Sequence, residues 1–320
     1  MFSFSEKINK IFHLKKTLTV GVWHKFRKPP WGGGNQFTIA LCKELSNKGV
    51  KILKNSLSSD IDVLLLNSIF FDVEKFRKFQ EKKKLKILYR IDGPIQLYRE
   101  KDKELDDHIF ELNKEFASIT ILQSNWSLEN ILKLGYEPIN PVVIHNAVDN
   151  EIFNNIGKKP IDKNRKIKII ASSWSANPRK GGAFYKWLEE NLDANKYEFT
   201  FVGRCSEKLV KANVIEPIPS NKLSKLLKQH DIYITASKQD PCSNALIEAL
   251  SCGLPALGLN DGGHPEIIKD GGLTFNGTED LLEKLDILTE NYDEYQAKIE
   301  VPHIKDVSVK YLELLKSIQE

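Results

Sequence analysis

Cysteine, methionine and long apolar runs are scarce in this sequence of 320 residues, which has four cysteines and one methionine. The cysteines lie far apart and lack the paired spacing of metal ligands, so we expect neither a disulfide framework nor a zinc site. No apolar run approaches the roughly 20 residues that span a bilayer, and the first residues lack the apolar centre of a secretory signal. The sequence therefore predicts a cytoplasmic protein with free thiols.

Neither sign of charge dominates, since the chain has 47 lysines and arginines against 43 aspartates and glutamates. The basic excess lies in residues 1–150, with 24 basic against 18 acidic side chains, whereas residues 151–320 have 23 against 25. A solvated, lysine-rich face explains this excess simply, and attraction to an anionic membrane or acceptor is the alternative. We expect no nucleic-acid partner.

The first 16 residues have the pattern of a short amphipathic helix, with Phe4, Ile8, Ile11 and Phe12 at helical spacing among lysines. Such a helix lies at a membrane surface or packs on the body of the protein, and the pattern suits both. We therefore keep peripheral contact with a membrane as a hypothesis.

Short apolar runs alternate with helical patterns along the chain, which is typical of parallel sheets covered by helices. The length suits two domains of about 150 residues, and the polar stretch 154–166 is typical of a linker. We expect α/β domains at 1–152 and 153–305, with a C-terminal helix in 306–320 that packs back on the first domain. The expected strands are 18–23, 63–66, 87–91, 119–122, 142–144, 168–172, 198–202, 214–216, 232–236, 255–259 and 273–275, with helices at 37–45, 183–192, 220–228, 244–252 and 307–318.

The segment from Asp240 to Pro255 carries the strongest functional signal. A loop of small polar residues leads from a strand into a helix that begins near Asn244, where free amide hydrogens and the positive end of the helix dipole suit a phosphate or diphosphate. Glu248, one turn further, can accept hydrogen bonds from both hydroxyls of a ribose. Asp240 precedes the loop and can reach sugar hydroxyls beyond the diphosphate.

The same segment resembles the signature of the large retaining GT-B glycosyltransferases, the glycosyl transferases group 1. The likeness rests on two acids separated by seven residues and on the following Cys252-Gly253-Leu254-Pro255, although the family usually has glutamate where this chain has Asp240. Further likenesses at 144–149, 178–182 and 261–266 extend it over nearly the whole chain. The resemblance implies two Rossmann-like domains facing across a cleft.

The resemblance also implies which cations bind the donor diphosphate. Lys180 matches the family's lysine, whose compact ammonium suits a phosphate. The family usually has an arginine six positions earlier, where this chain has Trp174. Arg179 or Arg204 could supply the second positive charge, and we favour Arg204.

In the first domain, two polar segments are expected to face the cleft, because ligands bind outside the carboxyl ends of parallel strands. Arg90 and Asp92 follow one such strand and stand where the family often has a histidine that contacts the transferred sugar. The loop Gly32–Gly34 is similar to the family's glycine loop, which approaches the diphosphate or the acceptor.

Each of these residues also has an ordinary explanation. The glycine run and Asp92 suit plain turns, Lys180 suits a surface lysine, and an isolated acid pair suits a helix cap and a solvated helix residue. The flanking motifs favour function. We therefore predict catalytic roles for Asp240, Lys180 and Asp92, and donor-binding roles for Glu248, Asn244, Ser243, Arg204, Arg179, Gly33, Gly34 and His264.

The resemblance implies transfer of a sugar from a nucleoside diphosphate donor to a hydroxyl of a glycan, glycolipid or glycoprotein, with retention at the anomeric carbon. We expect no metal ion and no further cofactor. Two alternatives stay open: an idle protein that only binds nucleotide sugars, favoured by Trp174 and Asp240, and a sugar-nucleotide epimerase on the same fold.

Overall fold

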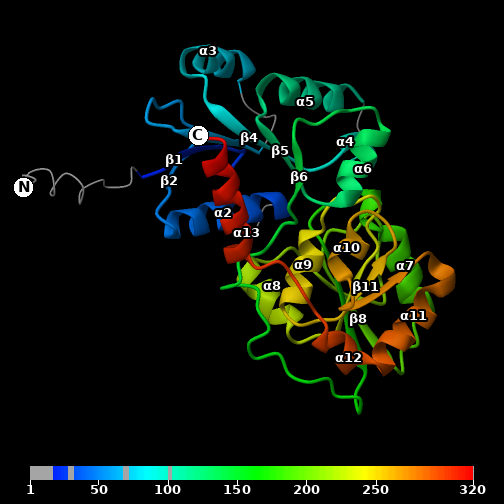
Figure 1. The fold of residues 1–320 in the computed structure, drawn as a ribbon. Helices are drawn as coiled ribbons and strands as arrows, with labels where there is room; N and C mark the ends of the chain where they lie inside the picture. The colour runs from blue at the N-terminus through cyan, green and yellow to red at the C-terminus, as the bar shows by residue number, and fades with distance from the viewer. Residues whose placement is uncertain (1–16, 28–31, 68–71, 100–102, 320) are drawn as a thin grey trace, which may run out of the picture.

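The computed structural model describes residues 17–27, 32–67, 72–99 and 103–319, which form two α/β domains (Figure 1). Each domain is built on one parallel sheet of six strands. The amphipathic pattern of residues 1–16 lies outside the described residues. Residues 154–166 hold no helix or strand and connect the two domains.

The first sheet has the strand order β2-β1-β3-β4-β5-β6, and all neighbouring strands are parallel. Successive side chains point to opposite faces, so Val20 and Val22 pack with one set of helices while Trp23 and Leu64 pack with the other. The chain order reverses direction between β1 and β3, which opens a crevice at their carboxyl ends. The strands are β1 (Thr19–Trp23), β2 (Lys51–Lys54), β3 (Val63–Leu66), β4 (Lys86–Ile91), β5 (Ile119–Leu122) and β6 (Pro141–Val143).

Helices cover both faces of the first sheet (Figure 1). Helix α2 shares one apolar cluster with the sheet, and Phe76 of α3 and Leu112 of α5 belong to the cluster on the opposite face. The helices described in this part of the chain are α2 (Gly33–Asn47), α3 (Val73–Lys83), α4 (Ile95–Tyr98), α5 (Lys103–Phe116) and α6 (Asn125–Lys133).

The second sheet has the order β12-β11-β10-β7-β8-β9 and is also parallel throughout. Its chain order reverses between β7 and β10, so a second crevice opens at the carboxyl ends of these two strands. The strands are β7 (Ile167–Ser173), β8 (Tyr197–Gly203), β9 (Asn213–Ile215), β10 (Ile232–Thr235), β11 (Ala256–Leu259) and β12 (Gly272–Phe275).

Two separate apolar clusters sandwich the second sheet. One holds Tyr185 of α7 and Leu285 of α11, and the other holds Leu227 of α8 and Leu246 of α9. Both faces of the central strands are therefore buried, as their nearly continuous apolar sequences require, whereas the edge strand β9 is largely exposed. The helical elements are η1 (Pro178–Lys180), α7 (Gly182–Asn191), α8 (Ser220–Leu227), α9 (Asn244–Ser251), α10 (His264–Ile268), α11 (Thr278–Glu290), α12 (Tyr292–Ala297) and α13 (Ile304–Ser317).

Helix α13 belongs to the core of the first domain although it follows the second domain in sequence (Figure 1). Its residues Val307, Tyr311 and Leu315 are at most 3% exposed and share the apolar cluster of α2 and β1. The two chain segments that cross between the domains pair with each other, since Val148 and His303 form a parallel bridge. The chain thus crosses the domain boundary twice, at adjacent points.

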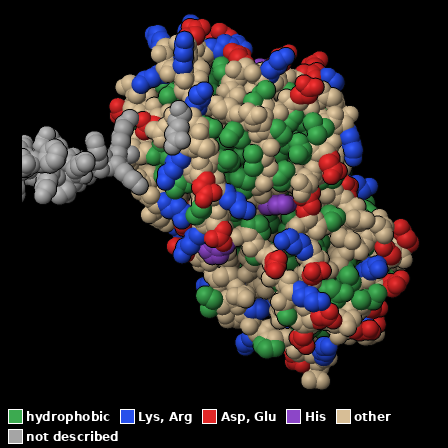
Figure 2. All heavy atoms as spheres, viewed as in Figure 1, with side chains coloured by type: hydrophobic (Ala, Val, Ile, Leu, Met, Phe, Trp, Pro, Cys, Tyr) green, Lys and Arg blue, Asp and Glu red, His purple; other side chains and the backbone are tan. Residues whose placement is uncertain are grey.

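Hydrophobic side chains gather on the drawn face of the first domain, between the positions of α13 and α6 (Figure 2). Basic and acidic side chains are interspersed around them on that face, so this view shows no single basic face. Among the residues that the structure describes, no helix is both long and apolar enough to cross a membrane.

Candidate donor-binding site

A cavity of about 530 Å³ lies between the two domains, at the carboxyl ends of both sheets. Its volume is in the range of about 300–1,000 Å³ that is usual for small-molecule sites. The second domain lines it with the end of β8, with the segments after β7, β9 and β10, and with helices α8 and α9. The first domain lines it with the glycine loop at the start of α2 and the segment after β4. Both topological switch points therefore open onto one space.

Helix α9 begins at this cavity. Ser243 is its N-cap, and the Ser243 hydroxyl accepts a hydrogen bond from the amide of Leu246 at 3.4 Å. Ser243, Asn244 and Ala245 line the cavity, so the positive end of the helix dipole faces it. Glu248, one helical turn beyond Asn244, lines the same cavity. An anionic group and a hydroxyl-bearing group would thus find matching partners one turn apart.

The carboxyl of Glu248 forms no hydrogen bond or ion pair with any residue that the structure describes, although it lines the cavity. Burial raises its pKa to about 8, because the charged form is poorly solvated there. At neutral pH this group is largely a neutral acid, which both donates and accepts hydrogen bonds. The Glu248 carboxyl can therefore form hydrogen bonds with two neighbouring hydroxyls of a ligand.

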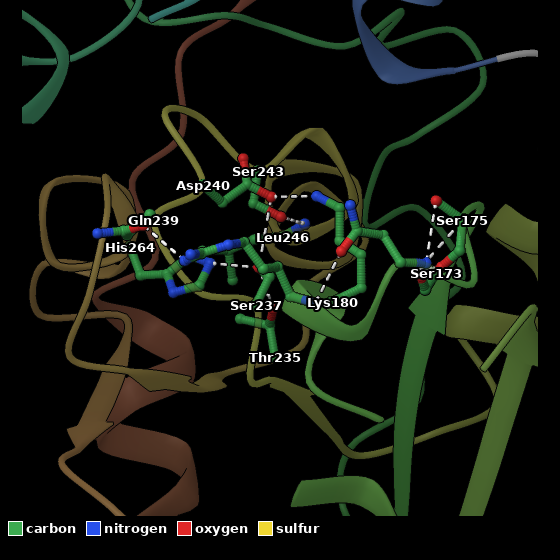
Figure 3. Close-up of polar contacts among 12 residues, drawn as sticks. Ser173, Ser175, Lys180, Thr235, Ser237, Gln239, Asp240, Ser243, Leu246 and His264 are labelled. Atoms are coloured by element: carbon green, nitrogen blue, oxygen red, sulfur yellow. Dashed lines mark hydrogen bonds and ion pairs between the residues drawn. The ribbon is translucent and has the colours of Figure 1, made fainter. Parts of the chain in front are cut away.

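Four side chains form a chain of polar contacts below the cavity (Figure 3). Lys180 Nζ lies 2.7 Å from Asp240 Oδ2 in an ion pair. Ser237 Oγ lies 3.3 Å from the same carboxylate oxygen and 3.0 Å from Nε2 of His264. Lys180 and Asp240 line the cavity, whereas His264 is fully buried. This series of contacts therefore ends at the charged pair of Lys180 and Asp240, which faces the cavity.

The hydrogen-bond pattern assigns the tautomer of His264. Its Nδ1 lies 3.0 Å from the carbonyl oxygen of Leu259, which only accepts, so Nδ1 carries the hydrogen. Burial lowers the pKa of His264, so the ring is neutral and Nε2 is an acceptor; the single hydroxyl hydrogen of Ser237 then goes either to this nitrogen or to Asp240 Oδ2. Burial alone would raise the pKa of Asp240, but the charge and the hydrogen bond of Lys180, together with further contacts such as the amide of Cys242, outweigh it and lower the pKa. Asp240 is thus an anion held in place, and a weak base.

The loop that carries Asp240 is fixed by the glycine turn after β11. The amide of Gly263 donates to the carbonyl oxygen of Asp240 at 2.9 Å, and the amide of Gln239 donates to Asp261 Oδ2 at 3.0 Å. The turn at 261–263 therefore supports the site from below. Its role is positional, since it does not line the cavity.

The glycine loop of the first domain touches the first residue of α9. A Cβ atom on Gly33 would lie 2.5 Å from Cβ of Asn244, which is closer than real Cβ contacts allow. Only glycine fits this approach without movement. Gly33 and Gly34 both line the cavity, opposite the start of α9.

A buried arginine organises the first-domain side of the site. Arg90 is 3% exposed, and its Nη1 donates to Asp92 Oδ1 at 2.7 Å while its Nη2 donates to Asn146 Oδ1 at 2.7 Å. The amide of Asn146 then donates to Asn244 Oδ1 in the second domain at 3.3 Å. Asp92 lines the cavity and is thus held by the same network that reaches α9.

The structure brings together eight of the predicted site residues and leaves three outside the cavity lining. Arg179 donates to Gln239 Oε1 at 2.6 Å, and the guanidinium of Arg204 lies over the Trp174 ring at 5.6 Å from its centroid. His264 is fully buried beneath Ser237 and lies outside the cavity lining, so its contact with a donor sugar stays a prediction. The residues in the lining are Asp240, Lys180, Asp92, Glu248, Asn244, Ser243, Gly33 and Gly34.

Several lining residues were missed by the sequence analysis. An apolar part of the lining comes from Val202, Pro217, Ile218 and Leu223, at the ends of β8 and β9 and in α8. Tyr98 and Arg99 line the cavity from the first domain. No motif marks these positions, and their place at the ends of parallel strands or on a short helix is the only sequence signal.

Among the described residues, no group of three or more histidine, cysteine, aspartate or glutamate side chains could hold a metal ion. The cationic side chains among the described residues of the cavity lining are Lys180 and Arg99. Lys180, the last residue of η1, forms an ion pair with Asp240, which also lines the cavity.

Residues 190–300 match the family model described as Glycosyl transferases group 1. This segment contains β8 to α12 and includes Asp240, Asn244 and Glu248. No curated protein sequence matches the chain significantly. The match independently covers the segment on which the sequence resemblance rests.

Solved structures show the same overall fold at low sequence identity. The Anabaena protein HepE, in complex with UDP and glucose, has a TM-score of 0.71 and 14% identity, over 94% of this chain and 100% of that one. A glycosyltransferase from Rickettsia africae has a TM-score of 0.68 and 15% identity, over 95% and 99%. Sucrose-phosphate synthase from Thermosynechococcus elongatus has a TM-score of 0.67 and 13% identity, over 94% and 99%. The predicted GT-B fold is confirmed.

Proposed function

We propose that this chain is a glycosyltransferase that moves a sugar from a nucleoside diphosphate donor to a hydroxyl acceptor, with retention at the anomeric carbon. The match of residues 190–300 and the GT-B fold support glycosyl transfer from a nucleotide sugar. Retention follows from the sequence resemblance. The acceptor is a glycan, glycolipid or glycoprotein hydroxyl.

One observation carries the proposal: the start of α9, Glu248 and Lys180 face a single cavity between the domains. The helix start and the ammonium suit the two phosphates, and Glu248 suits the ribose hydroxyls. The apolar lining at Pro217, Ile218 and Leu223 suits a base. The sugar then lies toward Asp240 and Asp92, where the domains meet.

The same arrangement supplies the chemistry of transfer. Negative charge builds on the leaving diphosphate as the glycosidic bond breaks, and Lys180 and α9 stabilise it where it develops. Donors fixed before the reaction need no reorganisation, and each contributes about 3 kcal/mol in well-studied enzymes. Asp240, held as an anion by Lys180, orients sugar hydroxyls and does not act as a strong base.

A second candidate is a protein that binds a nucleotide sugar without turning it over. Trp174 favours it, because the family usually has an arginine at that position. This candidate predicts nucleotide binding without release of nucleoside diphosphate. An assay for release of UDP from UDP-sugars, with and without simple glycoside acceptors, separates the two.

The first test is the thermal unfolding midpoint of the purified protein with UDP, GDP and ADP. A ligand at a hundred times its dissociation constant stabilises the folded state by about 2.7 kcal/mol. UDP is the first choice, since solved structures with this fold contain it. We expect one nucleotide to raise the midpoint and Glu248→Ala to abolish the rise.

The control variant is Glu300→Ala, which removes an exposed acid from the same domain. It should keep the nucleotide response of the wild type. Absence of any response in the wild type, with all three nucleotides and their sugar conjugates, would refute the proposed function. Product stereochemistry by NMR of the anomeric proton then tests retention.

A further inference from the structure

We propose that Arg99 of the first domain is the second cation that binds the donor diphosphate, in place of an arginine at position 174. This inference rests on the proposed function. It assigns to the first domain one of the two cations that bind the leaving group, whereas the sequence analysis placed both cations in the second domain.

The charges of the cavity point to Arg99. Among the described residues of the lining, Lys180 and Arg99 carry the two cationic side chains, against the carboxyls of Asp92, Asp240 and Glu248. Lys180 is already paired with Asp240 at 2.7 Å. A nucleoside diphosphate brings at least two negative charges, so one shared ammonium does not balance it. Arg99 is the other cation that faces the same space.

The two arginines that the sequence favoured contact other side chains. Arg179 bonds to Gln239, and Arg204 lies over the ring of Trp174. Neither lines the cavity. Arg99, in contrast, belongs to the cavity lining; like Arg204 it is exposed and makes no ion pair with a described carboxylate. Its guanidinium lies 5.3 Å from the centroid of the Tyr98 ring.

The backbone that carries Arg99 is held against the second domain. Gly93, just before α4, packs so closely on Pro241 that a Cβ atom would lie 2.8 Å from Pro241 Cγ. Its φ of 152° is also one that side chains rarely adopt. Pro241 follows Asp240 directly. The start of α4 is therefore fixed beside the loop that carries Asp240, the ion-pair partner of Lys180.

The short helix α4 then places its last residues at the site. Asp106, fully buried, accepts hydrogen bonds from the amides of Ile95 at 2.8 Å and Gln96 at 2.9 Å, which anchors the helix start. Burial raises the pKa of Tyr98, and the charges of Asp92 and Asp240 raise it further, so the phenol lies within electrostatic range of both acids. Arg99 is the next residue.

The chemistry of arginine suits this role. A guanidinium presents several N–H donors in one plane and binds phosphate oxygens in pairs. The long side chain needs only a rotation away from the Tyr98 ring to turn further into the cavity. Because Arg99 and Lys180 belong to different domains, a diphosphate held by both would favour a closed cleft.

The test is binding of UDP, UMP and uridine to the wild type and to Arg99→Ala by isothermal titration. A charge-assisted hydrogen bond contributes enough that its loss weakens binding by about tenfold or more. We expect that loss for UDP, a smaller one for UMP and none for uridine. Arg77→Ala is the matched control, since Arg77 lies on α3 and pairs with Glu115 and Glu74.

The possible outcomes are distinct. If the wild type binds none of UDP, GDP and ADP, the proposed function fails. If Arg99→Ala binds UDP like the wild type while Lys180→Ala does not, the inference on Arg99 is overturned and the proposed function stands. Unchanged UDP binding with slower transfer and normal donor hydrolysis would overturn it in favour of an anionic acceptor contact. A loss confined to Arg204→Ala or Arg179→Ala would also overturn it.

Discussion

Glu266 of the second domain caps a helix of the first. Its carboxylate accepts hydrogen bonds from the amides of Trp126 at 2.7 Å and Asn125 at 2.9 Å, the first two residues of α6. His145, in the segment that leads out of the first domain, lies 3.1 Å from the same carboxylate. A helix start is a favourable place for an anion. The domains are therefore joined by a polar contact as well as by the chain.

Glu266→Gln should weaken this contact and lower the thermal unfolding midpoint at pH 7. Burial alone would raise the pKa of Glu266, but His145 and the two amides outweigh it and lower the pKa to about 2. Its stabilising contribution is therefore complete above its ordinary pKa of about 4.5 and is lost as the pH falls toward 2. Charge-assisted hydrogen bonds are worth about 1.5–3 kcal/mol.

Scanning calorimetry of the wild type and Glu266→Gln at pH 7 and pH 3.5 measures this effect. The difference between the two proteins should be smaller at pH 3.5. Glu300→Gln, which changes the same charge at an exposed position, is the control. A difference that does not change between the two pH values would contradict the assigned pKa.

Glu248→Gln should stabilise the empty protein while it weakens nucleotide binding. The pKa of Glu248 is raised to about 8 by burial, so the folded state loses stability as the pH rises from about 4.5 through 8. Glutamine has no charge to bury. We expect a gain of about 1 kcal/mol at pH 8.5, or about 2–4 °C in the midpoint for domains of this size, and no gain at pH 4. Lower stability of the variant at pH 8.5 would contradict this.

Lys180→Ala should reduce turnover more than nucleotide binding. Stabilisation of the leaving diphosphate acts in the transition state, and loss of one donor costs about 3 kcal/mol, or roughly a hundredfold in kcat. Steady-state kinetics with a UDP-sugar measures the split between kcat and KM. Lys211→Ala, at an exposed lysine of the same domain, should behave like the wild type. A change in KM alone would remove Lys180 from the chemistry.

Gly33→Ala should destabilise the contact between the domains. The added methyl would lie 2.5 Å from Asn244, and such overpacking costs about 1–3 kcal/mol. Gly34→Ala is the matched control, because a Cβ there meets no atom within 4 Å. We expect a lower unfolding midpoint for the first variant and little change for the second. Equal midpoints would show that the loop moves at no cost.

Transfer should need no added metal ion. Lys180, the start of α9 and, by the inference above, Arg99 supply the positive charge that a metal would supply. We expect activity measured with a strong chelator to equal activity without it. Loss of activity that manganese restores would overturn this prediction.

Most strand positions were predictable because the central strands are buried on both faces, although the edge strands β6 and β9 are partly exposed. All eleven predicted strands occur, each within one or two residues, since uninterrupted apolar runs leave few alternatives. The edge strand β2, Lys51–Lys54, was missed. It is half exposed and lysine-flanked, and without its partner β1 its sequence does not distinguish it from a loop.

The site was predictable where a local motif carries it. Asp240, Asn244 and Glu248 lie within nine residues around one helix start, so sequence spacing fixes their geometry. The cations of the site were harder to predict, because the direction of each side chain decides whether it lines the cavity. Arg99 lines it, whereas Arg179 and Arg204 do not. Arg99 belongs to the other domain, and no spacing rule relates it to Lys180.

The core of the first domain includes helix α13, which the ribosome synthesises last. Tyr311 and Leu315 complete a core that otherwise consists of residues from the first half of the chain. A ribosome that has released the first 150 residues has not yet made these side chains. The growing chain must therefore keep the apolar faces of α2 and β1 uncovered while the second domain is translated and begins to fold. The first domain can therefore complete its core only after the second domain has been made.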